Sequence, residues 1–307
     1  MNNKLLLIIK IFIAVILLIF LIDYINGKEI IKTLKKIDLF YFLFALILVA
    51  VNIFLLYKKW LIISAEVLKI NDCKKILSSL LHGFAAGIIT PFRAGEYLAR
   101  NIALRVDPIN VALATFFDKI FNMIVILMVG WFFLVLLLIK NGNLNIVFLV
   151  NIIFLFCIYL IILIVKNKKL KELANSLSIK YKLFGTFYLA IKKYKDYNFS
   201  FYLKVILYST FHYFVILIQY TLILKAFGAN NTFGESTWYS ALVLFGKTII
   251  PPISFGEVGI REASSIFFAG YFNIMNSISF NTSIIIFFIN LLLPALFGSL
   301  YSVIEKK

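Results

Sequence analysis

The amino-acid sequence predicts an all-α, polytopic integral membrane protein with about six spanning helices and two re-entrant broken-helix hairpins in an inverted repeat. Three observations predict this class. The 307-residue chain is 63% hydrophobic, whereas soluble domains contain about 45–50% apolar residues. Long apolar runs recur along the chain, and two further apolar regions are interrupted by proline, glycine and charge. These two interrupted regions also share one sequence pattern.

Six apolar runs are long enough to cross a membrane, because a spanning helix needs about 20 apolar residues. They lie at roughly 5–22, 39–57, 118–139, 144–165, 203–226 and 278–302. Two more regions, 77–104 and 238–269, are broken. The first leg of the earlier region, 77–90, has 14 residues. It reaches about 21 Å as a helix, which is too short for a hydrocarbon core of about 30 Å. We therefore expect both regions to enter the membrane and turn back.

The basic residues predict the orientation of the chain. The formal net charge is +17, and the loops 58–76 and 166–199 hold five and nine lysines. The positive-inside rule places these loops, and with them both termini, in the cytoplasm. The loop 23–38 is then outside, although it holds four lysines. We expect a multi-pass protein of the cell (inner) membrane, and no nucleic acid as a partner, since basic loops beside spans account for the charge.

The two broken regions are one element used twice. A shift of 161 residues aligns 79–100 with 240–261, and nine of 22 positions are identical. The shared pattern is P-x3-G-E-x3-R, which uses residue types that are rare in this chain. The order of elements repeats as well, since each half contains two spans, a broken hairpin and a span.

Three predicted spans separate the hairpins, and an odd number places them in the membrane in opposite senses. The sequence therefore predicts a single domain, 1–307, with inverted-repeat halves of about 1–139 and 140–307. Many secondary transporters are built in this way, with broken helices that meet near the midplane. An old duplication without a role in transport is the alternative.

Prolines and glycines are expected to shape the hairpins. Prolines end the entering legs, and glycines allow the turns. The residues concerned are Pro91, Gly95, Pro252, Gly256 and Gly259.

Charged residues on the broken elements form the candidate binding site. Glu96 and Arg100 are four residues apart, as are Glu257 and Arg261, so each pair lies on one helix face. The returning leg presents free N–H groups and a positive dipole end to an anion, and Arg93 adds a guanidinium suited to phosphate. The candidate substrate-binding residues are Arg93, Glu96, Arg100, Lys247, Ser254, Glu257, Arg261 and Glu262. Alternatively, the pairs only neutralise each other and hold the hairpins.

Two asymmetries bear on this site. Arg93 corresponds to Ser254 in the second hairpin, so the first hairpin is the more cationic one. Lys247 could line the same cavity, could snorkel, or could pair with Asp118 or Glu262. Asp118 and Lys119 open a predicted span, a position that is typical of interfacial residues.

The sequence contains no feature of a catalytic site. It has no carboxylate cluster, no metal-ligand set and no sizeable soluble loop that could hold a donor substrate. We therefore expect no enzymatic activity, no metal and no cofactor.

The paired motifs resemble the lysylphosphatidylglycerol synthase transmembrane (flippase-like) family over nearly the whole chain. The residues that carry the resemblance are Thr90-Pro91-x-Arg93-x-Gly95-Glu96 and Pro252-x-Ser254-x-Gly256-x-x-Gly259-x-Arg261-Glu262. In such synthases, a separate soluble domain attaches lysine to the lipid and the membrane half moves the product. Because this chain ends at Lys307, soon after its last predicted span, we expect a stand-alone member without the soluble domain. Many relatives carry a second glycine at the position of Glu257.

The resemblance and the residues together predict a lipid translocator. The expected substrate is an anionic or aminoacylated phospholipid or a lipid-linked precursor, and the expected partners are membrane lipids. The alternative is an accessory subunit that supports a lipid-modifying enzyme or a glycosyltransferase, which it would recruit through the basic 166–199 loop.

Overall fold

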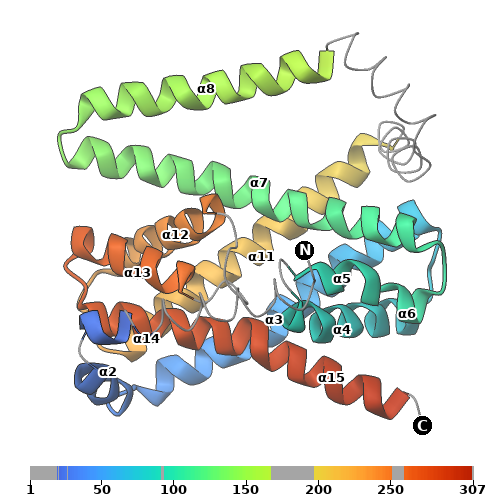
Figure 1. The fold of residues 1–307 in the computed structure, drawn as a ribbon, viewed down its shortest axis with the longest axis horizontal. Coiled ribbons are helices and arrows are strands. Elements are labelled where there is room, and N and C mark those ends of the chain that lie inside the picture. The colour runs from blue at the N-terminus through green and yellow to red at the C-terminus, as the bar shows by residue number, and fades with distance from the viewer. Residues whose placement is uncertain are drawn as a thin grey trace. The chain divides into compact units, whose positions relative to one another are not determined.

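The fold is known from a computed structural model, which describes residues 19, 21–25, 27–90, 93–166, 197–250 and 259–305. The regular elements in these ranges are all helical (Figure 1). The chain divides into two compact units, Met1–Gly130 with Leu203–Lys307, and Trp131–Tyr202. The elements of the first unit carry the candidate site.

The helices follow the order of the predicted repeat. The first half contains α2 (Gly27–Leu34), α3 (Leu39–Ile63) with a π-helical end η1 (Ser64–Leu68), α4 (Cys73–Ile89), α5 (Ala94–Ala99), α6 (Asn101–Leu104) and α7 (Pro108–Lys140). The rest of the chain contains α8 (Leu144–Lys166), α11 (Phe199–Ala226), α12 (Phe233–Ile249), α13 (Ile260–Ala269), η5 (Gly270–Phe272), α14 (Asn276–Phe287), η6 (Phe288–Leu292) and α15 (Leu293–Glu305).

Four helical stretches in the described residues are long and apolar enough to cross a membrane, which agrees with the predicted class. They are Leu39–Leu68, Pro108–Lys140, Phe199–Ala226 and Asn276–Ile304. Each contains one of the predicted spans, and α8 covers the predicted run 144–165. The predicted first span, 5–22, falls almost wholly outside the described residues. The protein is thus an all-α, multi-pass membrane protein, and its number of spans and the re-entrant path stay predictions.

The distribution of side chains on α3 is that of a helix in lipid. Its exposed face is apolar and includes Phe40, Phe44 and Ile47, all at least 49% exposed. Its inward face buries polar Asn52 and Lys59, at 3% and 1% exposure. A water-soluble helix shows the opposite pattern. An apolar exterior over a polar interior stabilises a helix in lipid only if the buried polar groups find partners.

The two broken elements have matching lengths. The entering legs α4 and α12 each run for 17 residues and end at equivalent points of the repeat. Each leg begins at a side-chain cap. Asp72 accepts hydrogen bonds from the backbone N–H groups of Lys74 and Lys75, and Thr232 forms a capping box with Glu235. Such caps satisfy the donors that a helix N-terminus leaves free.

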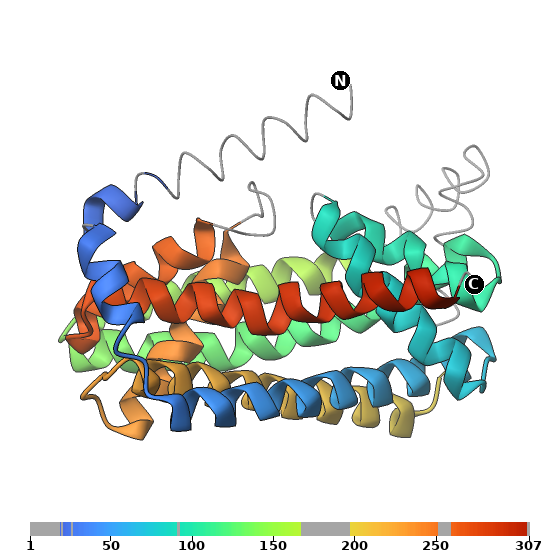
Figure 2. The same ribbon diagram turned by 90° about the horizontal axis from the view of Figure 1, so that it is seen from below.

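Small residues let the legs pack closely on long helices. Gly298 of α15 lies against the backbone carbonyl of Leu81 in α4, and Gly130 of α7 lies against the ring of Phe245 in α12. In Figures 1 and 2, α4 lies beside α15. The helices α12, α13 and α14 meet at buried hydroxyls, where the Oη of Tyr239 lies 2.6 Å from Ser265 Oγ and 2.9 Å from Ser279 Oγ. Each entering leg is therefore held from the side by polar contacts or by close backbone approach.

The break after α4 is built around Thr90. Its hydroxyl donates to the carbonyl of Ala86 at 2.9 Å and accepts the N–H of Gly95 at 2.7 Å. The left-handed residue in this turn is Arg93, with φ 55°. A Cβ on Gly95 would lie 2.6 Å from the carbonyl oxygen of Ala86. Gly95 therefore shapes the hairpin through close approach, and not through the backbone freedom that the sequence suggested.

The second break supports the expectation for Gly259, whose φ is 89°. This left-handed conformation favours glycine directly before α13. The other expected hairpin-shaping residues, Pro91, Pro252 and Gly256, lie outside the described residues.

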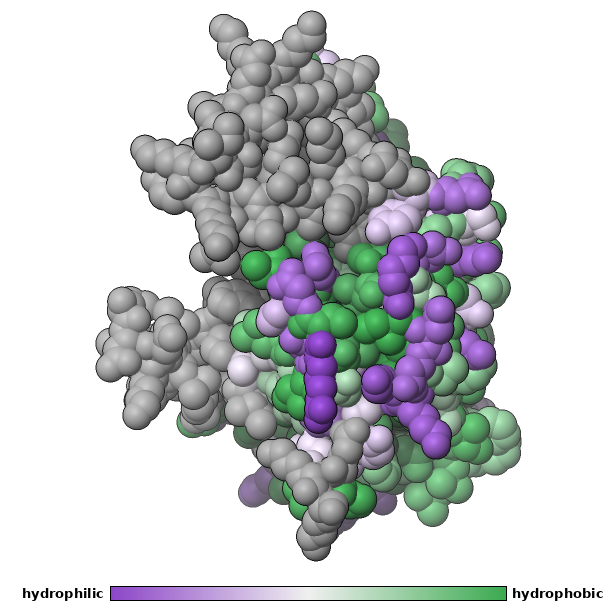
Figure 3. Space-filling view, turned by 90° about the vertical axis from the view of Figure 1, so that its right-hand side faces the viewer, coloured by the Kyte–Doolittle hydropathy of each residue, from purple (hydrophilic) through white to green (hydrophobic). Residues whose placement is uncertain are grey.

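Two predicted loops differ in the structure. Residues 58–68 continue the helical path of α3 and η1, so Lys59 is a buried helix residue and not part of a loop. In the predicted loop 23–38, α2 packs on α14, and Asn281 Nδ2 donates to the carbonyl of Ile30 at 3.0 Å. Exposed charge remains where η1 leads into α4, at Lys69, Asp72, Lys74 and Lys75. Hydrophilic side chains gather on this end of the described structure in Figure 3.

We predict that Gly95→Ala destabilises the protein by about 1–3 kcal/mol, because the added methyl group overpacks the turn. The check is a thermal unfolding curve in detergent, in which the midpoint of the variant should fall. Gly234→Ala is the matched control. Nothing lies within 4 Å of a Cβ at that helical position, so its midpoint should stay equal or rise slightly. Equal midpoints for both variants would contradict the close approach at Gly95.

Candidate functional site

The first hairpin gathers cations around one carboxylate. Glu96 is 0% exposed. Its Oε1 lies 2.6 Å from Arg100 Nη2, while its Oε2 lies 3.0 Å from Arg93 Nη2 and 2.7 Å from Lys119 Nζ. Arg93 and Arg100 lie three residues before and four residues after Glu96 along α5, so helical spacing brings all three side chains to one face. The predicted pair Glu96–Arg100 is present, and two further cations share its carboxylate.

A second buried pair lies behind this cluster. Lys59 Nζ is 2.7 Å from Asp118 Oδ1, and Arg100 Nη1 is 3.1 Å from Asp118 Oδ2. Lys59 also donates to Asn122 Oδ1 at 2.7 Å. The guanidinium of Arg100 lies 4.2 Å from the ring centre of Trp60. Asp118 is 2% exposed, so the interpretation of this residue as interfacial is wrong. It is one of two carboxylates that hold α3, α5 and α7 together.

In the second hairpin, Glu262 acts as a cap. Its Oε2 accepts the backbone N–H of Gly259 at 2.6 Å, and its Oε1 accepts the hydroxyl of Ser283 at 3.1 Å. Arg261 Nε lies 3.3 Å from the same Oε1, and its guanidinium lies 4.9 Å from the ring centre of Phe287. Among the described residues, the buried Nη2 of Arg261 has no hydrogen-bond partner. Arg261 thus keeps donor capacity that the described chain does not use.

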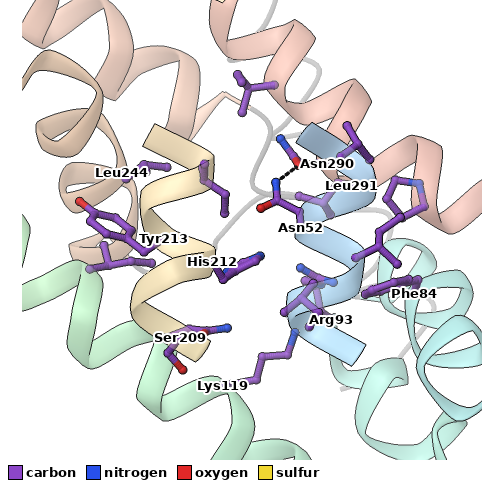
Figure 4. Close-up of a pocket in the computed structure, with 18 of the residues that line it drawn as sticks. Asn52, Phe84, Arg93, Lys119, Ser209, His212, Tyr213, Leu244, Asn290 and Leu291 are labelled. Atoms are coloured by element: carbon purple, nitrogen blue, oxygen red, sulfur yellow. Dashed lines mark hydrogen bonds between the residues drawn. The ribbon is translucent and has the colours of Figure 1, made fainter. Parts of the chain in front are cut away.

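A cavity of about 210 Å³ joins the two hairpins. Figure 4 shows Arg93, Lys119 and His212 directed towards the same space. Five cationic side chains and one carboxylate line the cavity, namely Arg93, Arg100, Lys119, Lys247, Arg261 and Glu96. Neutral polar groups from the crossing helices complete the polar lining, namely Asn52, Asn122, Ser209, His212 and Asn290. The arrangement can therefore hold an anion through several donors at once.

Amide side chains form one wall of the cavity. Asn52 Nδ2 lies 3.0 Å from Asn290 Oδ1, a contact drawn in Figure 4, and it also donates to Gln219 Oε1. Gln219 Nε2 donates to the carbonyl of Ala45 at 2.9 Å. Asn290 lies in the π-helical turn η6. Pro294 follows this turn and has no N–H to donate to the Asn290 carbonyl, which disrupts the α-helical ladder there.

The structure places the candidate residues as follows. Arg93, Glu96, Arg100, Lys247 and Arg261 line the one cavity. Glu262 is buried beside Arg261 and does not line it. The two acids considered as partners of Lys247, Asp118 and Glu262, contact other cations. Ser254 and Glu257 lie outside the described residues.

Sequence reasoning missed Lys59, Asn52 and Asn290, and it undervalued Lys119. Each of these is a polar residue within or beside an apolar run, which marks an inward-facing position in a membrane helix. Among the described residues, no group of three His, Cys, Asp or Glu side chains could hold a metal ion.

We predict that Asp118→Asn lowers stability by about 3–5 kcal/mol, because it leaves Lys59 and Arg100 with too little compensating charge. The double variant Lys59→Met/Asp118→Asn should recover much of this loss, since it restores the charge balance. The measurement is the fraction of monodisperse protein after heating in detergent. Lys58→Met, at the partly exposed neighbouring lysine, is the control and should change little. A double variant no more stable than Asp118→Asn would show that charge balance is not the cause.

Comparisons with known proteins agree with this architecture. The family model for the lysylphosphatidylglycerol synthase TM region matches residues 7–298. The comparison with curated proteins and the comparison with solved structures each found no match. The family match covers nearly the whole chain, including both hairpins and the helices around the cavity. The chain therefore belongs to the lysylphosphatidylglycerol synthase TM region family.

Proposed function

We propose that this protein is a lipid translocator that moves an anionic or aminoacylated phospholipid, or a lipid-linked precursor, between the leaflets of the cell membrane. One observation carries the proposal. The broken elements of both repeat halves contribute cations to a single cavity, where Arg93, Arg100 and Arg261 are joined by Lys119 and Lys247.

The chemistry of these side chains suits a lipid phosphate. A phosphate buried in an apolar medium is costly unless it is paired. Guanidinium groups can pair with it through two parallel hydrogen bonds. Arg93 and Lys119 are 28% and 30% exposed, so their charged ends can reach a ligand, whereas Arg100 is fixed between two carboxylates. The reachable cations would bind the headgroup, and the fixed one would hold the hairpin.

The size of the cavity favours a headgroup over a whole lipid. A space of about 210 Å³ has room for several water molecules and not for two acyl chains. The exposed apolar faces of the long helices leave the lipid tails in the bilayer. The headgroup would pass through the cavity while one repeat half moves against the other, as in transporters with inverted repeats. Such a protein carries out no group transfer and needs no cofactor.

The test is translocation in liposomes that contain the purified full chain. Fluorescent phosphatidylglycerol, lysylated phosphatidylglycerol and a polyprenyl phosphate are supplied in turn, and the fraction that an added quencher reaches is followed over time. We expect movement of at least one lipid. Arg93→Gln and Arg261→Gln should each slow it by about tenfold or more, because each removes a hydrogen bond to a charged group.

Lys204→Gln is the matched control, since Lys204 is an exposed lysine of α11 outside the cavity lining. It should translocate lipid at the wild-type rate. If Arg93, Arg100 and Arg261 could each be replaced in folded protein without slowing translocation, the proposed mechanism would fail. If folded protein moved none of the lipids, the accessory-subunit function would replace the proposal.

A further inference from the structure

The charges around the cavity divide into a buried, balanced set and a reachable set. The balanced set holds three cations and three carboxylates, all at most 3% exposed. Its members are Lys59, Arg100, Arg261, Glu96, Asp118 and Glu262. Every cation of this set lies within 3.3 Å of a carboxylate of the set. Because a buried charge is costly unless it is matched, this balance is what a stable interior requires.

Three further cations line the cavity without a matching carboxylate in the count. They are Arg93, Lys119 and Lys247, all partly exposed. Arg93 and Lys119 both contact Oε2 of Glu96, but Arg100 already balances that carboxylate. The count concerns charge alone, and the hydrogen bonds that these side chains make leave it unchanged. The cavity and its immediate partners therefore carry a surplus of three positive charges.

The residues outside the described ranges near the hairpin turns change this surplus little. Residues 91 and 92 are proline and phenylalanine, and the stretch 251–258 reads PPISFGEV, which holds a single carboxylate, Glu257. Even if Glu257 is counted with the cavity, two positive charges remain unmatched.

We propose that the cavity takes a headgroup with at least two negative charges on phosphate, which means a phosphate monoester or a diphosphate. This inference rests on the proposed function and names the substrate chemistry of the same site. A phosphate monoester carries about 1.5 to 2 negative charges at neutral pH, and a diphosphate carries more. A phosphodiester such as phosphatidylglycerol carries one, and would leave positive charge unmatched.

The same count disfavours a lysylated headgroup. Lysine esterified to phosphatidylglycerol adds two ammonium groups to one phosphodiester, so the headgroup is a net cation. Its entry would increase the positive surplus in a medium where like charges repel strongly. The surplus cations come from both halves of the repeat, since Arg93 and Lys119 belong to the first half and Lys247 to the second. A compact polyanion would neutralise both sides of the cavity.

The test compares headgroups on identical short acyl chains. Calorimetric titration of the detergent-solubilised full chain measures the affinity for dihexanoyl phosphatidic acid, phosphatidylglycerol and lysylated phosphatidylglycerol, and for diacylglycerol diphosphate. We expect phosphatidic acid and the diphosphate to bind at least about tenfold tighter than phosphatidylglycerol. The lysylated lipid should bind weakest. Lys247→Gln and Arg93→Gln should narrow the ratio between phosphatidic acid and phosphatidylglycerol, and Lys204→Gln should leave it unchanged.

The outcomes separate this inference from the proposed function. Equal affinities for phosphatidic acid and phosphatidylglycerol, or tightest binding of the lysylated lipid, would overturn the inference even if lipids were translocated. The predicted order of affinities would support it even if the liposome assay showed no movement, in which case the translocator proposal would fall. Each variant is tested only as monodisperse protein, so loss of folding cannot imitate loss of selectivity.

Discussion

The carboxylate of Glu96 is the constraint on which the first hairpin depends. It is wholly buried and lies within 3.0 Å of three cations from α7 and the turn and end of α5. Through Arg100 the network continues to Asp118, and from there to Lys59 on α3. A short irregular segment in a membrane must be held by its neighbours, because lipid cannot satisfy its polar groups. Here that support comes from charge, and it fixes where the reachable arginine and lysine enter the cavity.

The second hairpin solves the same problem with less charge. Glu262 satisfies a backbone N–H and a serine hydroxyl besides contacting Arg261, and the neighbouring helices meet through tyrosine and serine hydroxyls. The two halves therefore share a pattern in sequence but differ in how they are stabilised. This difference leaves the first hairpin more cationic, as the replacement of Arg93 by Ser254 in the repeat predicts.

The sequence predicted the helical class, both breaks and the Glu96–Arg100 pair, because these depend on local features such as apolar length, proline and helical spacing. It did not predict the partners of Asp118. Lys58 and Lys59 follow an apolar run as two equivalent lysines, and only the continuation of α3 beyond that run turns one of them inwards. Nor could spacing show that Arg93, and not Gly95, takes the left-handed conformation, since that depends on the close packing of Gly95 against α4. Contacts between distant segments decide these points, and a single sequence does not contain them.

The amide wall of the cavity differs from the ionic wall in how readily it can change. Asn52 shares its amide between Gln219 and Asn290, which come from helices of the other repeat half. Amide hydrogen bonds carry no net charge, so they can exchange one neutral partner for another, or for water, without exposing an unbalanced ion. The ion pairs of the opposite wall cannot separate so cheaply. The cavity thus has a stiff side and a compliant side, and an opening movement would begin along the seam of asparagine and glutamine.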